Sequence, residues 1–73
     1  MRVLVTGAFG WTAAAIVKAV KHAGHKVVAF DLPTAVCSDE MRALFDKVVL
    51  GTIAVFADVY CATQSIDAII HLA

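Results

Sequence analysis

A short glycine-containing turn between two apolar segments constrains this chain more than any other feature. Residues 3–5 are apolar, and residues 13–23 carry small and branched apolar side chains at the i, i+3, i+4, i+7 spacing of an amphipathic helix. The first segment is typical of a strand buried on both faces of a parallel sheet. Gly7 and Gly10 lie between the two segments. The order of strand, glycine turn and helix predicts the first half of a βαβ unit.

Strand and helix signals alternate along the rest of the chain. Gly24 predicts the end of the first helix, Pro33 follows the end of a second buried strand, and Ser38 is a suitable N-cap for a short helix. The other expected elements are strands over 26–30, 48–50 and 68–72 and a helix over about 56–64. We therefore expect an α/β fold with a Rossmann-type parallel sheet, in the order βαβαβαβ with four strands and three helices.

The composition is more apolar than a chain of this size requires. Hydrophobic residues make up 62% of the 73 residues, above the roughly 45 to 50% typical of soluble domains. The longest uncharged run, residues 3–17, is too short and too interrupted by glycine for a spanning helix. A secretory signal remains an alternative, because Arg2 precedes an apolar stretch with alanines at 13–15. A piece of a larger domain, whose remainder covers the apolar faces, fits the composition better.

Charges, cysteines and histidines argue against several kinds of partner. Six basic and six acidic residues balance, which indicates neither a nucleic-acid-binding surface nor a membrane-binding patch. Cys37 and Cys61 lie 24 positions apart and form no metal-binding pattern, so we expect reduced, buried thiols in a cytoplasmic protein. A helix stop separates His22 from His25, and we expect no metal site there.

The chemistry expected of the turn is the binding of a diphosphate. Gly7 can adopt backbone angles that other residues avoid, and Gly10 lets the main chain approach a ligand closely. Ala13 keeps the helix close to the sheet. Free N–H groups at the start of the helix then attract phosphate oxygens without a lysine. The alternative is an ordinary glycine-containing turn in an α/β protein that binds no nucleotide.

Asp31 is the second chemical signal, at the end of the second predicted strand. It lies 21 positions beyond Gly10, where a carboxylate can accept hydrogen bonds from both hydroxyls of an adenosine ribose. The same carboxylate repels a 2'-phosphate, and no arginine or lysine lies between Leu32 and Met41 to receive one. We therefore expect NAD to be preferred over NADP. The alternative is that Asp31 is a solvated turn residue.

Two motifs resemble a known family. Residues 6–13, TGAFGWTA, resemble the Thr-Gly-x-x-Gly-x-x-Gly turn of the extended short-chain dehydrogenases/reductases, which include the NAD-dependent sugar epimerases and dehydratases. Residues 67–73, DAIIHLA, are similar to the Asp-x-Val-Ile-His-Leu-Ala motif of that family. The resemblance implies that Trp11 and Thr12 lie over the diphosphate. It also implies that Leu72 and Ala73 face the cofactor.

The resemblance further implies adenine contacts after the third strand, where the family has Gly-Asp-Leu or Gly-Asp-Ile. Gly51-Thr52-Ile53 has the required spacing of about 15 positions from Thr52 to Asp67. Asp58 is only nine positions from Asp67, which leaves no room for the intervening helix. We therefore assign the contacts to Thr52 and Ile53. The chain departs from the family pattern with Ala13 for the third glycine and Thr52 for the aspartate, and a neutral hydroxyl predicts weaker binding.

The family's catalytic Tyr-x-x-x-Lys pair is absent from these residues. Tyr60 is followed four positions later by Gln64 and lies in a predicted helix, so no catalytic residue is assigned. For His71, packing or a hydrogen bond is the expected role. We expect residues 1–73 to be the N-terminal portion of one NAD(P)-binding domain, in which the part beyond Ala73 supplies catalysis and holds a nucleotide-sugar or similar small-molecule substrate. The alternatives are a non-catalytic NAD(P)-binding regulator or redox-sensing module, and an α/β module without nucleotide; the full-length protein could form homo-oligomers.

Overall fold

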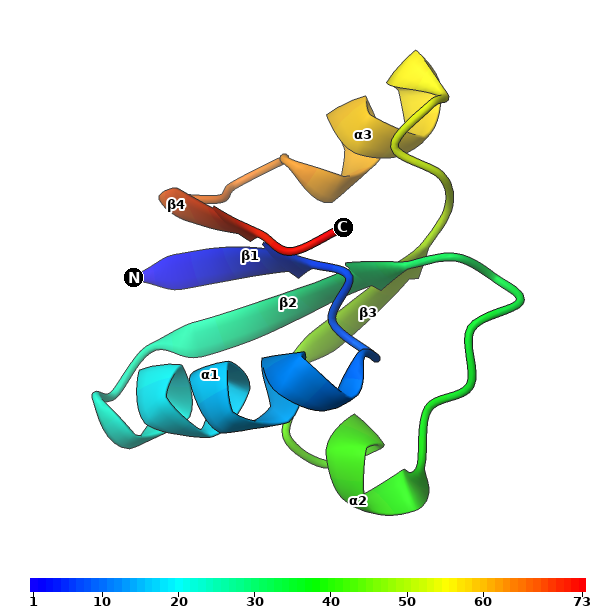
Figure 1. Ribbon diagram of the computed structural model, residues 1–73. Coiled ribbons are helices and arrows are strands. Elements are labelled where there is room, and N and C mark those ends of the chain that lie inside the picture. The colour runs from blue at the N-terminus through cyan, green and yellow to red at the C-terminus, as the bar shows by residue number, and fades with distance from the viewer.

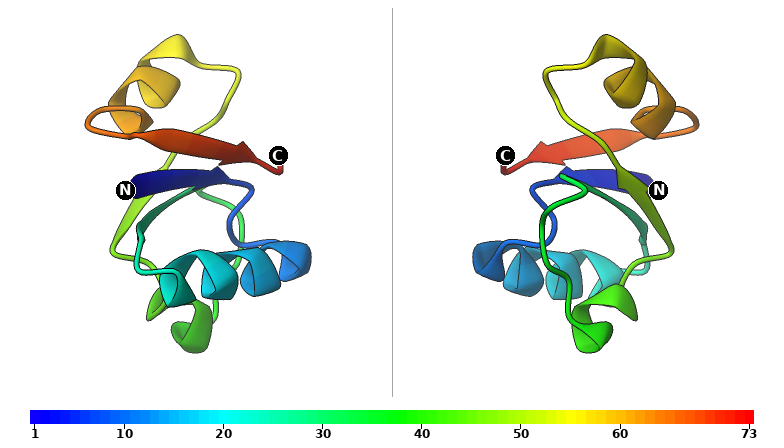
Figure 2. Two further views of the ribbon diagram at one scale, coloured as in Figure 1. Left: turned by 90° about the vertical axis from the view of Figure 1, so that its left-hand side faces the viewer. Right: turned by 90° about the vertical axis from the view of Figure 1, so that its right-hand side faces the viewer.

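Four strands form a single parallel sheet in the computed structural model, which describes residues 1–73. The strands are β1 (Arg2–Thr6), β2 (Lys26–Asp31), β3 (Lys47–Leu50) and β4 (Ala68–His71), in the spatial order β3-β2-β1-β4. The helices are α1 (Trp11–His22), α2 (Asp39–Arg42) and α3 (Phe56–Ala62). In Figure 1, α1 and α2 lie on one face of the sheet and α3 lies on the other, and the side views of Figure 2 agree. The expected α/β fold with four strands and three helices is confirmed.

The two central strands carry the core, as the apolar run at residues 3–5 predicts. In β1 and β2, residues 3–6 and 27–30 are buried on both faces of the sheet. Because side chains alternate along a strand, they feed two clusters. The larger cluster, toward α1 and α2, contains Val3, Val5, Ala8, Val17, Val27, Ala29 and Phe45. The smaller one, toward α3, contains Leu4, Val28, Phe30 and Ala62.

The helix boundaries follow local capping signals. Ser38 Oγ accepts a hydrogen bond from Met41 N at 3.2 Å, which confirms its N-cap role. The first helix stops before Gly24, whose φ is 91°, as predicted. Ala23 is exposed at the end of α1, so the buried stripe ends earlier than its spacing predicts. The third helix ends at Ala62, two residues short of the expected limit; Thr63 is its C-cap, and the Gln64 side chain donates to Tyr60 O at 2.9 Å.

The chain crosses from one face of the sheet to the other between β3 and β4. As a result, β2 lies on one side of β1 and β4 on the other. Such a reversal opens a crevice at the carboxyl ends of the strands, where open α/β sheets bind their ligands. The turn after β1 and the C-terminal residue both lie at this edge (Figure 1). No helix of the structure combines the length and apolar character that crossing a bilayer requires.

Candidate functional site

Five of the residues singled out from the sequence line one cavity at the carboxyl ends of the strands. The cavity measures about 340 Å³ and is lined by Gly7, Phe30, Asp31, Leu32, Gly51, Thr52, Ile53 and Ala73. The predicted residues among these come from four separate segments of the chain. The others, Gly10, Trp11, Thr12 and Leu72, are not part of this lining, and three of them form the start of α1. The fold thus brings the motifs to one edge of the sheet.

Gly7 forms the corner where the chain leaves β1. Its φ of 66° lies in the left-handed region, which confirms the conformational role predicted for this glycine. A Cβ atom here would lie 3.0 Å from backbone atoms of Leu72 and Ala73. The N–H of Gly7 donates to Phe30 O at 2.9 Å, which ties the turn to β2. Gly7 therefore lets the end of β4 pack directly against the turn.

Gly10 is a glycine for a different reason. Its backbone angles, φ −66° and ψ 150°, are open to any residue. A Cβ atom here would meet only one protein atom within 4 Å, Gly7 O at 3.4 Å. Neither conformation nor packing within the chain therefore demands glycine at this position. The space beside Gly10 stays open, as close approach of a ligand to the main chain requires.

The start of α1 offers free backbone donors beside that space. Gly10 is the N-cap and provides no side-chain hydrogen bond, and the first turn contains no acidic residue. The N–H groups of Trp11 and Thr12 donate to no atom of the chain. Trp11 is 89% exposed, so its side chain is not packed against the protein core. Two free donors at the positive end of a 12-residue helix favour an anion.

Asp31 is not simply a solvated turn residue. Its Oδ2 accepts a hydrogen bond from Phe9 N at 2.8 Å, within the glycine turn. Its Oδ1 accepts from Leu32 N, also at 2.8 Å. Each carboxylate oxygen can accept a second hydrogen bond, so both remain capable of receiving a ribose hydroxyl. Asp31 therefore joins the end of β2 to the turn and orients its carboxylate at the cavity.

The segment after β3 is held by a contact that the sequence spacing did not indicate. Thr52 N donates to Asp58 Oδ2 at 3.0 Å, and Asp58 lies in the first turn of α3. Its place inside α3 agrees with the spacing argument against Asp58 as the strand-end residue. Thr52 Oγ1 accepts from Ala54 N at 3.2 Å, and Thr52 O accepts from Val55 N at 3.1 Å. The Ile53 N–H donates to no atom of the chain.

Thr6 fixes the end of β4, a role that its buried position inside an apolar strand did not reveal. Its Oγ1 accepts from Leu72 N at 3.1 Å and from Ala73 N at 3.4 Å. Its distance to His71 Nδ1 is 2.6 Å. The oxygen that accepts from these two N–H groups therefore also bonds to the His71 ring. The structural role predicted for His71 is confirmed.

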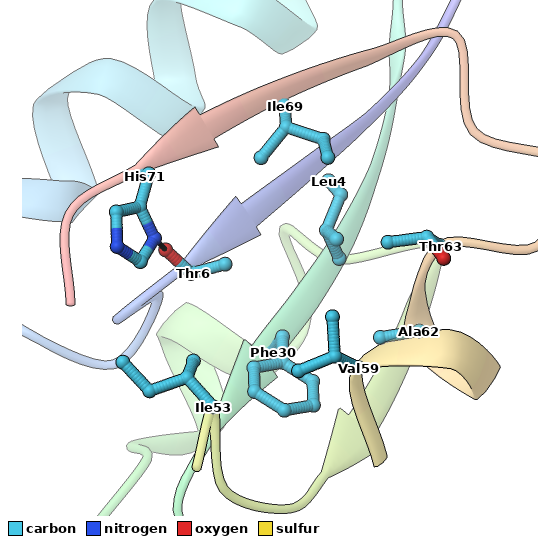
Figure 3. A pocket seen from close by; sticks show the side chains of 9 residues that line it. All are labelled: Leu4, Thr6, Phe30, Ile53, Val59, Ala62, Thr63, Ile69 and His71. Carbon is cyan, nitrogen blue, oxygen red and sulfur yellow. Dashed lines mark hydrogen bonds between the residues drawn. The ribbon is translucent and has the colours of Figure 1, made fainter. Parts of the chain in front are cut away.

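A second cavity of about 430 Å³ lies between the sheet and α3, and Figure 3 shows its lining. Most of the lining is apolar. In Figure 3, Thr6 and His71 point toward each other on one side, while Ala62 and Thr63 lie on the opposite side. Tyr60 lines neither cavity; it is 57% exposed and stacks on Phe56 with ring centroids 6.0 Å apart.

Two ionisable groups have shifted pKa values, and both lie outside the linings of these cavities. Burial raises the pKa of the Cys37 thiol, partly offset by the nearby Arg42 charge. A hydrogen bond from Lys21, followed by one from Val27 N, lowers the pKa of Asp46. Both cysteines are free, but Cys37 is only half-buried and Cys61, on the outer side of α3, is exposed, so the expectation of two buried thiols is wrong for Cys61 and holds only in part for Cys37. No group of three or more potential ligand side chains is arranged to hold a metal ion.

The parallel sheet carries a glycine turn, a first helix without a side-chain cap and a carboxylate at the end of β2. These features define a dinucleotide-binding protein of the Rossmann type. Comparison with known families specifies it further. The profile of the NAD-dependent epimerase/dehydratase family matches residues 3–73, and the chain belongs to this family. None of the curated proteins matches the chain.

Solved structures share the fold of this chain. A protein assigned to the NAD-dependent epimerases/dehydratases from Bacillus halodurans is 32% identical, with a TM-score of 0.81. A short-chain dehydrogenase/reductase superfamily protein from Agrobacterium tumefaciens, solved with bound NAD, is 26% identical, with a TM-score of 0.76. An epimerase-like protein from Burkholderia cenocepacia has a TM-score of 0.86 at 24% identity. All or 99% of this chain is covered, but only 33%, 20% and 24% of the respective structures.

Proposed function

We propose that this chain is the NAD-binding N-terminal portion of a longer epimerase, dehydratase or reductase domain. The observation that carries the proposal is the pair of free N–H groups at Trp11 and Thr12, next to a glycine that nothing within the chain requires. A diphosphate held there satisfies both donors and lies at the positive end of α1. The bound NAD in the Agrobacterium tumefaciens relative supports the choice of ligand.

The adenosine half of NAD is assigned to the 340 Å³ cavity. Asp31 receives the ribose hydroxyls on the lone pairs that Phe9 N and Leu32 N leave free. Thr52 and Ile53 contact the adenine. Gly7, Leu72 and Ala73 border the path of the dinucleotide toward the end of β4. Because Asp31 is the only charged residue lining the cavity, a 2'-phosphate meets repulsion without a compensating cation, and NAD is preferred over NADP.

The bound nicotinamide supplies hydride transfer to or from a substrate hydroxyl or carbonyl carbon. The chain spans 20% to 33% of the length of the solved relatives described above, and no Tyr-x-x-x-Lys pair occurs in it. Catalytic residues and the site for a nucleotide-sugar or similar substrate are therefore assigned to the rest of the protein. A non-catalytic dinucleotide-binding regulator is distinguished from this enzyme by measuring turnover in the full-length protein.

Gly10→Val in the full-length protein tests the site. The valine side chain occupies the space proposed for the diphosphate, while the backbone angles at this position remain accessible. We expect the dissociation constant for NAD to rise about tenfold to hundredfold, since overfilling a packed contact costs about 1–3 kcal/mol. Calorimetric titration with NAD measures this change, and thermal unfolding confirms that the variant is folded.

Ala15→Val is the matched control, because Ala15 is an exposed residue of the same helix. It adds similar bulk away from the proposed site and should leave NAD affinity unchanged. A folded Gly10→Val variant with wild-type affinity for NAD contradicts the proposal, as does a wild-type protein that does not bind NAD.

A further inference from the structure

The loop Gly51-Thr52-Ile53 is held by an acidic side chain from the following helix. Asp58 is half-buried in the first turn of α3, and its Oδ2 accepts a hydrogen bond from Thr52 N at 3.0 Å. Its other carboxylate oxygen accepts no hydrogen bond from the chain. The N-cap of α3, Val55, contributes no side-chain hydrogen bond. Asp58 is thus the one side chain of α3 that bonds back to the loop.

The Asp58 side chain lies very close to Gly51. A Cβ atom at Gly51 would lie 2.8 Å from Cβ, Cγ and Oδ2 of Asp58, a separation that real Cβ atoms do not show. Gly51 does not have a positive φ, so its backbone conformation does not require glycine. The requirement at this position is therefore steric and is imposed by the Asp58 side chain, from its Cβ to its carboxylate.

With the loop held in this way, a small set of polar groups remains available at the cavity. Asp58 occupies Thr52 N, and Val55 N occupies Thr52 O. The Ile53 N–H donates to nothing, and Thr52 Oγ1 accepts only from Ala54 N. Both residues line the cavity that also contains Asp31. One free donor and one hydroxyl that can still accept therefore lie on adjacent residues.

This pair of groups complements one edge of adenine. Adenine presents an amino donor at position 6 beside the N1 acceptor. Hypoxanthine has the opposite pattern, with a carbonyl acceptor at position 6 and an N1–H donor. A loop that presents the Thr52 hydroxyl oxygen and the Ile53 N–H in fixed positions binds the first base better than the second. Discrimination depends on the position of the loop, because a hydrogen bond weakens steeply with distance and angle.

We propose that Asp58 is the positioning residue of the adenine-binding loop, and that it gives the site its preference for adenine over hypoxanthine. This inference rests on the proposed function. A purely structural alternative is that Asp58 only stabilises the positive end of α3. That role affects thermal stability but does not change the choice of base.

The test compares binding of ADP and inosine diphosphate to the full-length protein by calorimetry. The two probes share ribose and diphosphate and differ only in the base edge. We expect the wild-type protein to bind ADP about tenfold more tightly, which corresponds to one well-placed hydrogen bond to the base. In Asp58→Ala the ratio should fall to within about twofold of one. Asp58→Asn keeps an acceptor for Thr52 N and should retain a ratio within about threefold of wild type.

Asp39→Ala is the control, since Asp39 lies in the first turn of α2 and does not line the cavity. Gly51→Ala is a second route to the same change, because its Cβ displaces the Asp58 carboxylate. It should lower the ratio as Asp58→Ala does, and the two substitutions are made separately because Asp58→Ala keeps the Cβ that lies 2.8 Å from the added atom. The second variant keeps the test decisive if the other is unstable.

The outcomes separate the inference from the function on which it rests. A folded Asp58→Ala or Gly51→Ala variant with the wild-type preference for ADP overturns the inference alone. A wild-type protein that binds both diphosphates equally also overturns it while leaving NAD binding intact. A wild-type protein that binds neither ADP nor NAD overturns the proposed function and this inference together.

Discussion

The two ends of the proposed dinucleotide site are built in different ways. At the diphosphate end, the ligand-facing groups are backbone amides of Trp11 and Thr12, and a glycine leaves room for them to be reached. At the adenine end, the loop from Gly51 to Ile53 takes its position from a side chain six residues after Thr52. The first end depends on the helix itself. At the second end, one carboxylate adds to the backbone bonds from Gly51 N to Asp31 O and from Val55 N to Thr52 O.

This difference determines how each end tolerates change. Backbone amides persist through any substitution that preserves the turn, so only added bulk or altered backbone angles damage the diphosphate end. We expect the adenine end to lose part of its geometry when the Asp58 side chain is shortened, because no other side chain of α3 bonds to the loop. We therefore expect a substitution at Asp58 to change the preference for adenine over hypoxanthine while the fold is retained. The predictions below test the comparison, beginning with the largest effect.

Gly7→Ala should be the most damaging substitution in the turn. It combines a φ of 66° with a Cβ placed 3.0 Å from the backbone at Leu72 and Ala73. We expect the free energy of unfolding to fall by about 2–4 kcal/mol, from left-handed strain of about 1–2 kcal/mol plus the displacement of β4. Urea unfolding of the full-length protein measures the loss.

Gly24→Ala is the matched comparison for Gly7→Ala. Its φ of 91° carries a similar conformational cost, but nothing lies within 4 Å of the added Cβ. We expect a loss of only about 1 kcal/mol. Equal losses at the two glycines would show that the contact with the end of β4 contributes nothing to stability.

The fold could be predicted almost completely from the sequence. The strands, the helix stop at Gly24 and the cap at Ser38 depend on nearest neighbours, which a sequence shows directly. The errors are at boundaries and at exposure. Ala23 satisfies the apolar spacing, but it caps the helix and is exposed; Cys61 is small and apolar in character, yet it faces outward from α3.

The two ends of the candidate site could be predicted from the sequence to different extents. Residues of the diphosphate end belong to one contiguous motif, so their spacing was sufficient to place them around α1. The hydrogen bonds from Thr6 to the end of β4 and from Thr52 to Asp58 join residues whose pairing depends on how the strands and helices pack. Spacing correctly put Asp58 inside a helix. It could not show that the first turn of this helix places the carboxylate against Gly51.

Asp31→Asn should have an intermediate effect, and on selectivity more than on stability. It removes the only charge that lines the adenosine cavity while retaining an acceptor for Phe9 N or Leu32 N. We expect the ratio of NADP to NAD affinity to rise about tenfold, as expected for loss of a partly screened repulsion. Parallel titrations with the two dinucleotides measure the ratio. An unchanged ratio would show that the Asp31 carboxylate does not face the ribose.

The smallest expected effect concerns Asp46, a carboxylate that also accepts from a backbone amide but lies at the opposite end of the sheet. Its bonds to Lys21 Nζ and Val27 N, at 2.8 and 2.7 Å, lower the pKa of Asp46 in the folded protein. Since its folded pKa lies below the ordinary value of 3.8, its stabilisation is complete above that pH and is lost as the pH falls through the lowered pKa.

Asp46→Asn should therefore reduce the free energy of unfolding at pH 7 by less than about 1 kcal/mol, because the ion pair with Lys21 is partly exposed and screened. The difference from wild type should shrink at pH values below 3.8, where the wild-type carboxylate also becomes neutral. Urea unfolding at the two pH values provides the measurement. Dinucleotide affinity at pH 7 should not change, because Asp46 is remote from the cavity. A loss of NAD binding in this variant would mean that the carboxylates at the two ends of the sheet are coupled, and that Asp31 and Asp58 do not act locally.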